Sequence, residues 1–247
     1  MIPLKSEKDL AMMRDSSMIL ARVMKKIRQE VKAGITTEKL NRLAEELIGN
    51  EGAQAAFKGY KGFPASICTS VNEEIVHGIP GARTLKEGDI ISLDLGVNYQ
   101  GYFSDLAITV GIGRINPRLR ALIEVTKKAL SEGIKQAWPE NRLSDISYAI
   151  QSYVEKNGFS VVREFVGHGI GLDLHEEPEI PNFGKAGLGP VLKKGMVLAI
   201  EPMVNMGSWE SRILENGWTA VTKDGLESAH FEHTVVITED GPQILTG

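Results

Sequence analysis

The stretch Gly88-Asp-Ile-Ile-Ser-Leu-Asp94-Leu-Gly-Val-Asn-Tyr-Gln-Gly-Tyr-Phe-Ser-Asp105-Leu-Ala-Ile-Thr-Val110 decides the fold. Two apolar, β-branched runs flank a glycine-containing turn at 98–101, which predicts two antiparallel strands. Each strand carries an aspartate, Asp94 or Asp105, where a core strand favours an apolar residue. A buried carboxylate costs free energy unless it is paired or binds a metal. Two of them facing each other across a hairpin would repel, so we expect a shared cation.

The same pattern returns later in the chain. Gly195-Met-Val-Leu-Ala-Ile-Glu201 matches 88–94, with the acid six positions after the glycine in both. Glu232-His-Thr-Val-Val-Ile237 then corresponds to 105–110. The acids are eleven residues apart in the first copy and thirty-one in the second, so twenty residues are inserted in the second loop. Two matches in the same order indicate an internal repeat and predict four acids on four strands.

The residues before each strand pair show the apolar spacing of amphipathic helices, with capping residues or proline at their starts. Each half therefore reads as two helices followed by strands that bear two acids. We expect one α+β domain over residues 1–247, with pseudo-repeat halves at about 1–113 and 114–247. The expected helices run from Ser6 to Gly34, from Thr36 or Thr37 to about Gly52, from Asn116-Pro117 toward Trp138, and from Ser144 to Gly158.

Composition excludes several classes of protein. The chain has 247 residues, 42% hydrophobic and 24% charged, as in ordinary globular proteins. A net charge of −4 without a basic cluster argues against nucleic-acid binding. No apolar run approaches the roughly 20 residues of a membrane span, and the N-terminus lacks a signal-peptide core. The single cysteine, Cys68, excludes an internal disulfide and fits a reducing cytoplasm. We therefore expect a cytoplasmic protein that binds neither membrane nor nucleic acid.

The charge of the four acids indicates how many cations they need. Together they carry −4, which two divalent ions neutralise, whereas one ion leaves −2 in a medium of low dielectric. His168 lies in Val166-Gly-His-Gly-Ile-Gly171, where glycines allow the backbone to come close to a site. A lone histidine is usually structural, but the neighbouring acids favour a ligand role here. An oxygen-rich set with one histidine suits Mn, Fe, Co or Zn, and a pair of such ions supports hydrolysis.

The segment Phe57-Lys-Gly-Tyr60-Lys-Gly-Phe63-Pro-Ala-Ser-Ile-Cys68 interleaves aromatic residues with glycine and proline. Its rings either line a site or pack on the core, and by themselves the residues favour core packing. His175 follows His168 by seven positions, but Pro178 prevents the His-Glu-x-x-His helix of many zinc enzymes.

The spacing of the five expected ligands, with Gly-His-Gly-Ile-Gly-x3-His and Phe231-Glu-His-Thr, resembles the type I methionine aminopeptidases in their bacterial form. The resemblance covers nearly the whole chain. It implies the pita-bread (creatinase/aminopeptidase) fold, with two pseudo-twofold-related halves around a curved antiparallel sheet. It also implies a monomeric metallo-exopeptidase that removes the N-terminal methionine from nascent proteins and short Met-peptides near ribosomes, preferably when the second residue is small.

The resemblance also implies roles for the ligands. Asp94 would bind one of two divalent metal ions, and Asp105 and Glu232 would bridge both. His168 and Glu201 would complete the shell of the other ion. A water between the two ions would attack the scissile carbonyl.

Catalytic and substrate-binding residues follow from the same resemblance. Glu201 would be the proton shuttle, and His77 and His175 would hold the substrate and the developing oxyanion. An aromatic and sulfur-bearing pocket suits the methionine side chain. The implied pocket residues are Tyr60, Phe63, Cys68 and Trp218, with Leu174 and Met203 as further candidates for its wall.

Three positions depart from the pattern of the family. Leu174 stands where some members have phenylalanine, and Phe57 where some have cysteine. His230 replaces a common glutamine and bears on the subsite for the second residue. None of the three removes a ligand, and neutral drift is favoured over a new specificity.

Three other functions stay open at this point. The first is another pita-bread hydrolase, of the aminopeptidase P or prolidase kind, although those enzymes usually carry a further N-terminal domain. The second is a non-catalytic binding member, although such proteins typically lose ligands. The third is a purely structural cation site, which would not need His77, His168 and His175 beside an aromatic pocket.

Overall fold

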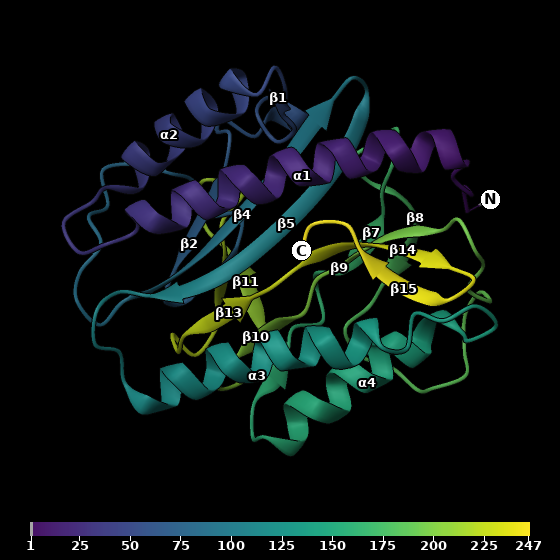
Figure 1. Cartoon of the computed structure of the whole chain (residues 1–247). Helices are drawn as coiled ribbons and strands as arrows, with labels where there is room; N and C mark the ends of the chain where they lie inside the picture. The colour runs from purple at the N-terminus through teal and green to yellow at the C-terminus, as the bar shows by residue number, and fades with distance from the viewer. Residues whose placement is uncertain (1) are drawn as a thin grey trace.

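The computed structural model describes residues 2–247, and within that range two pairs of long helices flank a set of curved strands (Figure 1). Helices α1 and α2 lie along one side of the strands, and α3 and α4 along the other. Among these residues, no helix combines the length and the apolar content needed to cross a membrane. The helices are α1 (Glu7–Glu30), α2 (Thr37–Asn50), α3 (Pro117–Ile134) and α4 (Leu143–Lys156), with a short 3₁₀ helix η1 (Tyr60–Gly62).

The strands form four sheets in which every pairing is antiparallel. This arrangement confirms the predicted α+β class. The first sheet has the order β1-β4-β2 with β5 on β4, and the last has the order β15-β14-β9-β7-β8. Two small sheets have the orders β13-β10-β6 and β11-β12-β3. The strands are β1 (Gln54–Ala55), β2 (Cys68–Val71), β3 (Glu74–Val76), β4 (Ile90–Tyr99), β5 (Tyr102–Gly111), β6 (Ser160–Val161), β7 (Gly167–Gly169), β8 (Glu176–Ile180), β9 (Val197–Ile200), β10 (Met203–Asn205), β11 (Ser211–Ile213), β12 (Ala220–Thr222), β13 (Ser228–His230), β14 (His233–Thr238) and β15 (Gly241–Ile244).

The predicted hairpin is β4–β5, and its turn has the expected chemistry. Gln100 and Gly101 have φ of 52° and 86°, the left-handed pair of a two-residue hairpin turn. The register pairs Asp94 with Ala107 and Gly96 with Asp105. The two aspartates therefore share one face of the hairpin as diagonal neighbours, with Asp105 two residues from the direct partner of Asp94.

The second pair of acids lies at strand ends. Ile200 of β9 pairs with His233 of β14 at the end of this ladder, and Glu201 and Glu232 are the adjacent residues just outside the two strands. The prediction of four acids on four strands therefore holds for β4 and β5, while the other two acids flank β9 and β14. Because Glu201 and Glu232 lie just beyond the strand ends, their side chains can extend toward the neighbouring β4–β5 hairpin.

Most helix starts follow the predicted capping residues. Ser6 Oγ accepts the Asp9 amide, and Thr36 caps α2. The first helix ends at Glu30, before the expected Gly34, because Val31 is already extended. The prediction that Ser144 caps the fourth helix is wrong.

The start of α4 is set by two other residues. Asp145 accepts the amide of Arg142, at 2.8 Å, so Arg142 is the cap residue. Ser144 instead bonds the backbone of Leu188, donating to its carbonyl at 2.9 Å and accepting from its amide at 2.6 Å.

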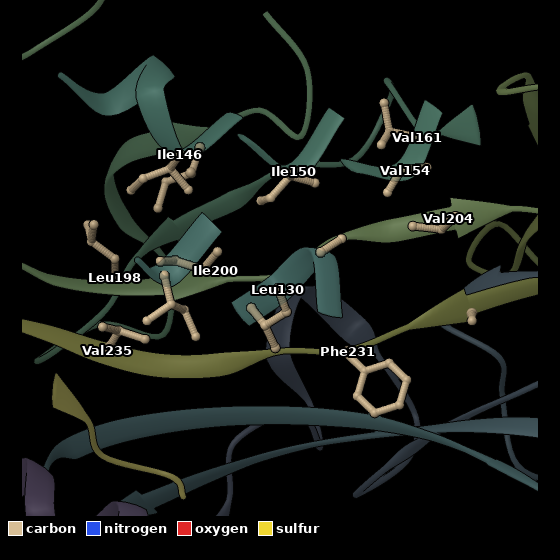
Figure 2. Packing of buried hydrophobic residues seen from close by; sticks show 14 of the residues in the cluster. Leu130, Ile146, Ile150, Val154, Val161, Leu198, Ile200, Val204, Phe231 and Val235 are labelled. Carbon is tan, nitrogen blue, oxygen red and sulfur yellow. The ribbon is translucent and has the colours of Figure 1, made fainter. Parts of the chain in front are cut away.

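Each helix pair buries its apolar face against its own strands. Leu130 of α3 and Ile150 of α4 pack with Leu198 and Val235 of the β9–β14 pair (Figure 2). The two helices approach so closely that a Cβ on Gly133 would lie 2.7 Å from Ile150. A second cluster joins α1 and α2 to β2, β4 and β5. Full burial of one such side chain stabilises the folded state by about 1.5–3 kcal/mol, so these clusters hold the helices of each half against its strands.

The two halves share matched backbone contacts. The Gly88 amide bonds the Ile112 carbonyl, and the Gly195 amide bonds the Ile237 carbonyl, with glycine φ of 92° and 86°. In return, the amides of Ile112 and Ile237 bond the residue after each glycine. We propose that these matches mark the repeat, with halves at about 1–113 and 114–247 in one domain.

Candidate active site

One cavity of about 220 Å³ collects the residues to which the sequence assigned chemistry. All five expected ligands and all six expected catalytic or pocket residues line it. Leu174 lines it as well, whereas Met203 does not. Met203 is fully buried and packs with Ile75 and Val76, so the expectation that it forms a pocket wall is wrong.

The carboxylates come together because backbone bonds join the two halves at this point. The Glu232 amide donates to the carbonyl of Ala107, which is the register partner of Asp94. Thr234 Oγ1 accepts the Asp105 amide at 3.0 Å and donates to its carbonyl at 2.9 Å. Hairpin β4–β5 and strand β14 are thereby held in one relative position, which places both pairs of acids around the cavity.

The Gly-His-Gly segment brings an imidazole to the same point. A Cβ on Gly167 would lie 2.4 Å from the Ala199 carbonyl oxygen, so glycine is required for the close approach of β7 to β9. His168 Nδ1 bonds the Gly169 carbonyl at 2.9 Å. A carbonyl only accepts, so Nδ1 is the donor, and Nε2 is the nitrogen whose lone pair a metal ion could use. Such an orienting bond is typical of metal-binding histidines.

Ligand atoms of Asp105, His168 and Glu232 lie within 4.8 Å of one another, as a metal-binding group would. His168 Nε2 is also 3.5 Å from Glu201 Oε1. Asp94 lies diagonally beside Asp105, on the same face of the hairpin. Three carboxylates and one imidazole thus converge, with a fourth carboxylate beside them.

Burial makes this cluster electrostatically costly. It raises the pKa of Asp94 and of Glu201 to about 7. Burial, reinforced by the charges of the neighbouring carboxylates, raises the pKa of Asp105 and of Glu232 well above their ordinary values. Asp94 Oδ1 and Glu232 Oε1 are buried without a hydrogen-bond partner among the described residues.

A divalent cation would resolve both features of the cluster, the repulsion between the buried acids and the unpartnered oxygens. It would bind the unpartnered carboxylate oxygens and offset the repulsion between the acids. The donor set, rich in oxygen with one neutral imidazole, therefore fits metal ions that accept oxygen and nitrogen ligands.

Two further histidines face the cavity as neutral rings. Burial lowers the pKa of His77 to about 4 and that of His175 to about 3. His175 stacks on Tyr60, with ring centroids 5.2 Å apart, and lies 4.1 Å from the ring of His168. A neutral imidazole retains one N–H, so each ring can donate to a carbonyl oxygen without adding charge.

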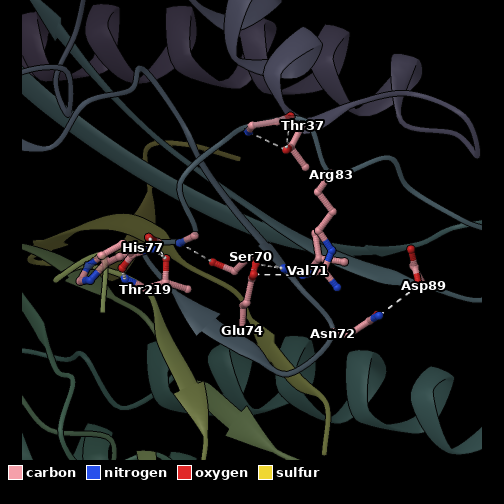
Figure 3. Close-up of polar contacts among 12 residues, drawn as sticks. Thr37, Ser70, Val71, Asn72, Glu74, His77, Arg83, Asp89 and Thr219 are labelled. Atoms are coloured by element: carbon pink, nitrogen blue, oxygen red, sulfur yellow. Dashed lines mark hydrogen bonds and ion pairs between the residues drawn. The ribbon is translucent and has the colours of Figure 1, made fainter. Parts of the chain in front are cut away.

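His77 has a strained backbone that its surroundings hold in place. Its φ of 59° is rare for a bulky residue and costs on the order of 1–3 kcal/mol. Thr219 donates its hydroxyl to the His77 carbonyl at 3.2 Å, and Ser70 accepts the amide of the next residue, Gly78 (Figure 3). Strain of this kind gathers at sites where the position of a side chain matters.

The aromatic segment lines the cavity and does not only pack on the core. Phe63 and Trp218 meet edge to face, 5.2 Å apart. Cys68 is the register partner of Asp94, and burial raises the pKa of its thiol, which stays protonated. These side chains form an apolar pocket beside the acids.

Comparison with known proteins identifies the family. Residues 11–239 match the model of metallopeptidase family M24. The chain belongs to this family. It is 54% identical to the methionine aminopeptidase of Clostridium perfringens over 246 residues, covering 100% of this chain and 99% of the relative. It is 53% identical to methionine aminopeptidase 1 of Bacillus subtilis, with the same coverage.

Solved structures agree with this membership of family M24. Methionine aminopeptidase from Rickettsia prowazekii has a TM-score of 0.99 at 42% identity and covers 100% of both chains. The prolidase from Pyrococcus furiosus has a TM-score of 0.82 at 23% identity, with 99% of this chain aligned to 65% of that one, and shares the fold. The predicted resemblance to methionine aminopeptidases and the pita-bread fold are both confirmed.

The three positions that depart from the family pattern differ in whether they line the cavity. Phe57 and Leu174 line the cavity, whereas His230 does not. His230 lies behind Glu201, with Nε2 3.4 Å from Glu201 Oε2.

Sequence reasoning missed Lys61 and Asn182. Lys61 lines the cavity, and its charge within an aromatic segment was the available signal. Asn182 donates to the Glu201 carbonyl at 3.0 Å, and no pattern in the sequence marks it.

Proposed function

We propose that this chain is a metal-dependent methionine aminopeptidase that removes the N-terminal methionine from peptides and nascent proteins, preferably before a small second residue. The observation that carries this proposal is one cavity in which four carboxylates and His168 adjoin an apolar, aromatic pocket. The relatives that bear the name methionine aminopeptidase match the chain over its whole length.

The ligand set supports two divalent ions, of Mn, Fe, Co or Zn. Asp94 would hold one ion, Asp105 and Glu232 both, and His168 with Glu201 the other. Bound divalent ions polarise a carbonyl and make water nucleophilic at neutral pH.

Glu201 would move the proton. Its carboxylate lines the cavity, where it could take a proton from a water and pass it to the leaving amine. His77 and His175 would donate to the carbonyl oxygen of the substrate, because both rings are neutral and face the cavity. Preorganised donors of this type stabilise the charge that develops on that oxygen.

The pocket would take the methionine side chain. Phe63, Trp218 and Cys68 provide aromatic faces and a sulfur atom, which suit a flexible thioether. The free α-amine of the substrate would lie near the carboxylates, which restricts cleavage to the first residue. We expect the protein to act as a monomer in the cytoplasm, near ribosomes, without binding membrane or nucleic acid.

The test is hydrolysis of Met-Ala-Ser against Leu-Ala-Ser, Pro-Ala-Ser and Ala-Pro-Ser. The metal-free protein is reconstituted with each of the four metals in separate anaerobic assays. We expect metal-dependent release of methionine alone. Release mainly from Ala-Pro-Ser would assign the chain to aminopeptidase P chemistry instead, and metal binding without any turnover would indicate a non-catalytic binding protein.

A further inference from the structure

His230, the last residue of β13, is buried without a partner. Its side chain is 2% exposed, and neither ring nitrogen has a hydrogen-bond partner among the described residues. A buried polar group left unpaired costs about 1–3 kcal/mol. The ring also does not line the cavity, so contact with substrate does not explain it.

The backbone of His230 is fixed to the hairpin that carries Asp94 and Asp105. The Thr109 hydroxyl accepts the His230 amide at 2.8 Å and donates to its carbonyl at 2.8 Å. Because a hydroxyl has one proton, Ser92 must be the donor in the 2.8 Å bond between Ser92 and Thr109. Ser92 and Thr109 are register partners on β4 and β5, so the position of the ring is set by the same strands that hold the aspartates.

The Glu201 carboxylate lies between two imidazoles that differ in whether Nε2 presents a lone pair or a proton. Oε1 is 3.5 Å from His168 Nε2, and Oε2 is 3.4 Å from His230 Nε2. His168 uses its Nδ1 proton on the Gly169 carbonyl, so its Nε2 presents a lone pair to Oε1. The lone pairs of His168 Nε2 and Glu201 Oε1 repel each other, and a cation bound between the two atoms relieves that repulsion. His230 has no such bond, so its Nε2 is free to carry the proton.

We propose that His230 is a positioning residue: its Nε2–H, 3.4 Å from Glu201 Oε2 and not bonded to it in this structure, donates to that oxygen once the site is occupied and keeps Oε1 turned toward His168 and the metal site. Asn182 holds the Glu201 carbonyl at 3.0 Å, so backbone and side chain are then both oriented. Outer hydrogen bonds of this type direct ligating carboxylates and raise metal affinity. The inference rests on the proposed function, because it presumes that Glu201 binds a metal.

The experiment compares Co²⁺ binding to metal-free wild type, His230→Leu and His230→Gln by titration calorimetry and by the visible absorption of the Co²⁺-loaded protein. We expect His230→Leu to weaken Co²⁺ binding about 10- to 100-fold and to change the absorption bands. His230→Gln keeps an N–H donor of similar reach, so it should restore affinity and spectrum. The control is His233→Leu, because the ring of His233 bonds Thr246 and does not line the cavity, and wild-type affinity is expected there.

Several outcomes would overturn the inference. Wild-type affinity in His230→Leu would show that the ring does not orient a ligand. Loss in His230→Gln equal to that in His230→Leu would show that a donor is not what the site needs. An equal loss in His233→Leu would assign the effect to damage of the core. If wild type itself bound no Co²⁺, the proposed function would be contradicted. If wild type cleaved Met-Ala-Ser and His230→Leu bound Co²⁺ with wild-type affinity, only the inference about His230 would be contradicted.

Discussion

Thr234 and Asp105 exchange two hydrogen bonds across the boundary between the halves of the chain. The Asp105 amide donates to Thr234 Oγ1 at 3.0 Å, and that hydroxyl donates to the Asp105 carbonyl at 2.9 Å. Both residues are buried, with Thr234 0% and Asp105 4% exposed. One threonine on β14 therefore fixes the position of an expected bridging ligand on β5.

Replacing Thr234 by valine should disturb both stability and metal binding. The change keeps the shape but leaves the amide and carbonyl of Asp105 unpaired in the interior, which costs about 1–3 kcal/mol. Urea unfolding of the metal-free protein and Co²⁺ titration measure the two effects. Thr238→Val is the matched control, because its hydroxyl bonds only Gly241 and Asp240, both within the outer turn of β14–β15. Equal stability and affinity in the two variants would contradict the role of Thr234.

Glu201→Gln should abolish most turnover while the protein stays folded. The substitution is isosteric but removes the proton acceptor and one carboxylate of the ligand set. General acid–base groups contribute about 10²- to 10⁴-fold, so kcat for Met-Ala-Ser should fall at least that far in saturating metal. Activity near that of wild type in metal-replete buffer would exclude Glu201 as the proton shuttle.

The carboxylate cluster predicts how the stability of the metal-free protein depends on pH. Burial raises the pKa of Asp94 and Glu201 to about 7, so the folded state holds protons that the unfolded state has lost. Their contribution to stability is fully present below about pH 4 and is lost as pH rises through 7. Burial lowers the pKa of His77 and His175, which acts in the opposite sense, and this effect fades as the pH rises through about 6.5, where the unfolded histidines lose their protons.

Between pH 6.5 and 8 the opposing contribution of the histidines fades, and the four carboxylates whose pKa is raised dominate among these groups. We expect the free energy of unfolding of the metal-free protein to fall as pH rises across this window, and Asp94→Asn to reduce the slope. A divalent metal that binds the ionised acids should remove the fall. Urea titrations at several pH values, with chelator or with metal, measure this. A flat or rising profile in chelator would rule out the predicted electrostatic strain.

The hairpin was predictable from sequence because its signals are local. Gln100-Gly101 between β-branched runs specifies a two-residue turn, and the turn fixes the register. The diagonal offset of Asp94 and Asp105 follows from that register, although it was not predicted. The repeat then located Glu201, which follows Gly195 by six positions as Asp94 follows Gly88, and Glu232, because 232–237 matches 105–110.

Other features depend on contacts distant in sequence. Ser144 has the composition of a helix cap, but Leu188 competes for its hydroxyl, and Asp145 then serves the helix start. His230 was predicted to bear on substrate selection as a departure from a family pattern. Its burial behind Glu201 depends on Thr109 and β10, which no local pattern reveals. Met203 has the hydrophobicity of a pocket wall, yet β10 turns it into the core.

Trp218→Ala should weaken discrimination between methionine and leucine at the first position. The ring meets Phe63 edge to face at 5.2 Å and lines the cavity, so its loss widens the pocket where a long, flexible side chain would lie. We expect kcat/KM to fall more for Met-Ala-Ser than for Leu-Ala-Ser. The matched control is Trp209→Ala, since Trp209 stacks with Arg163, is 37% exposed and does not line the cavity. If the ratio of the two kcat/KM values stayed constant in Trp218→Ala, the methionine pocket would have to be formed by Tyr60, Phe63 and Cys68 without the indole.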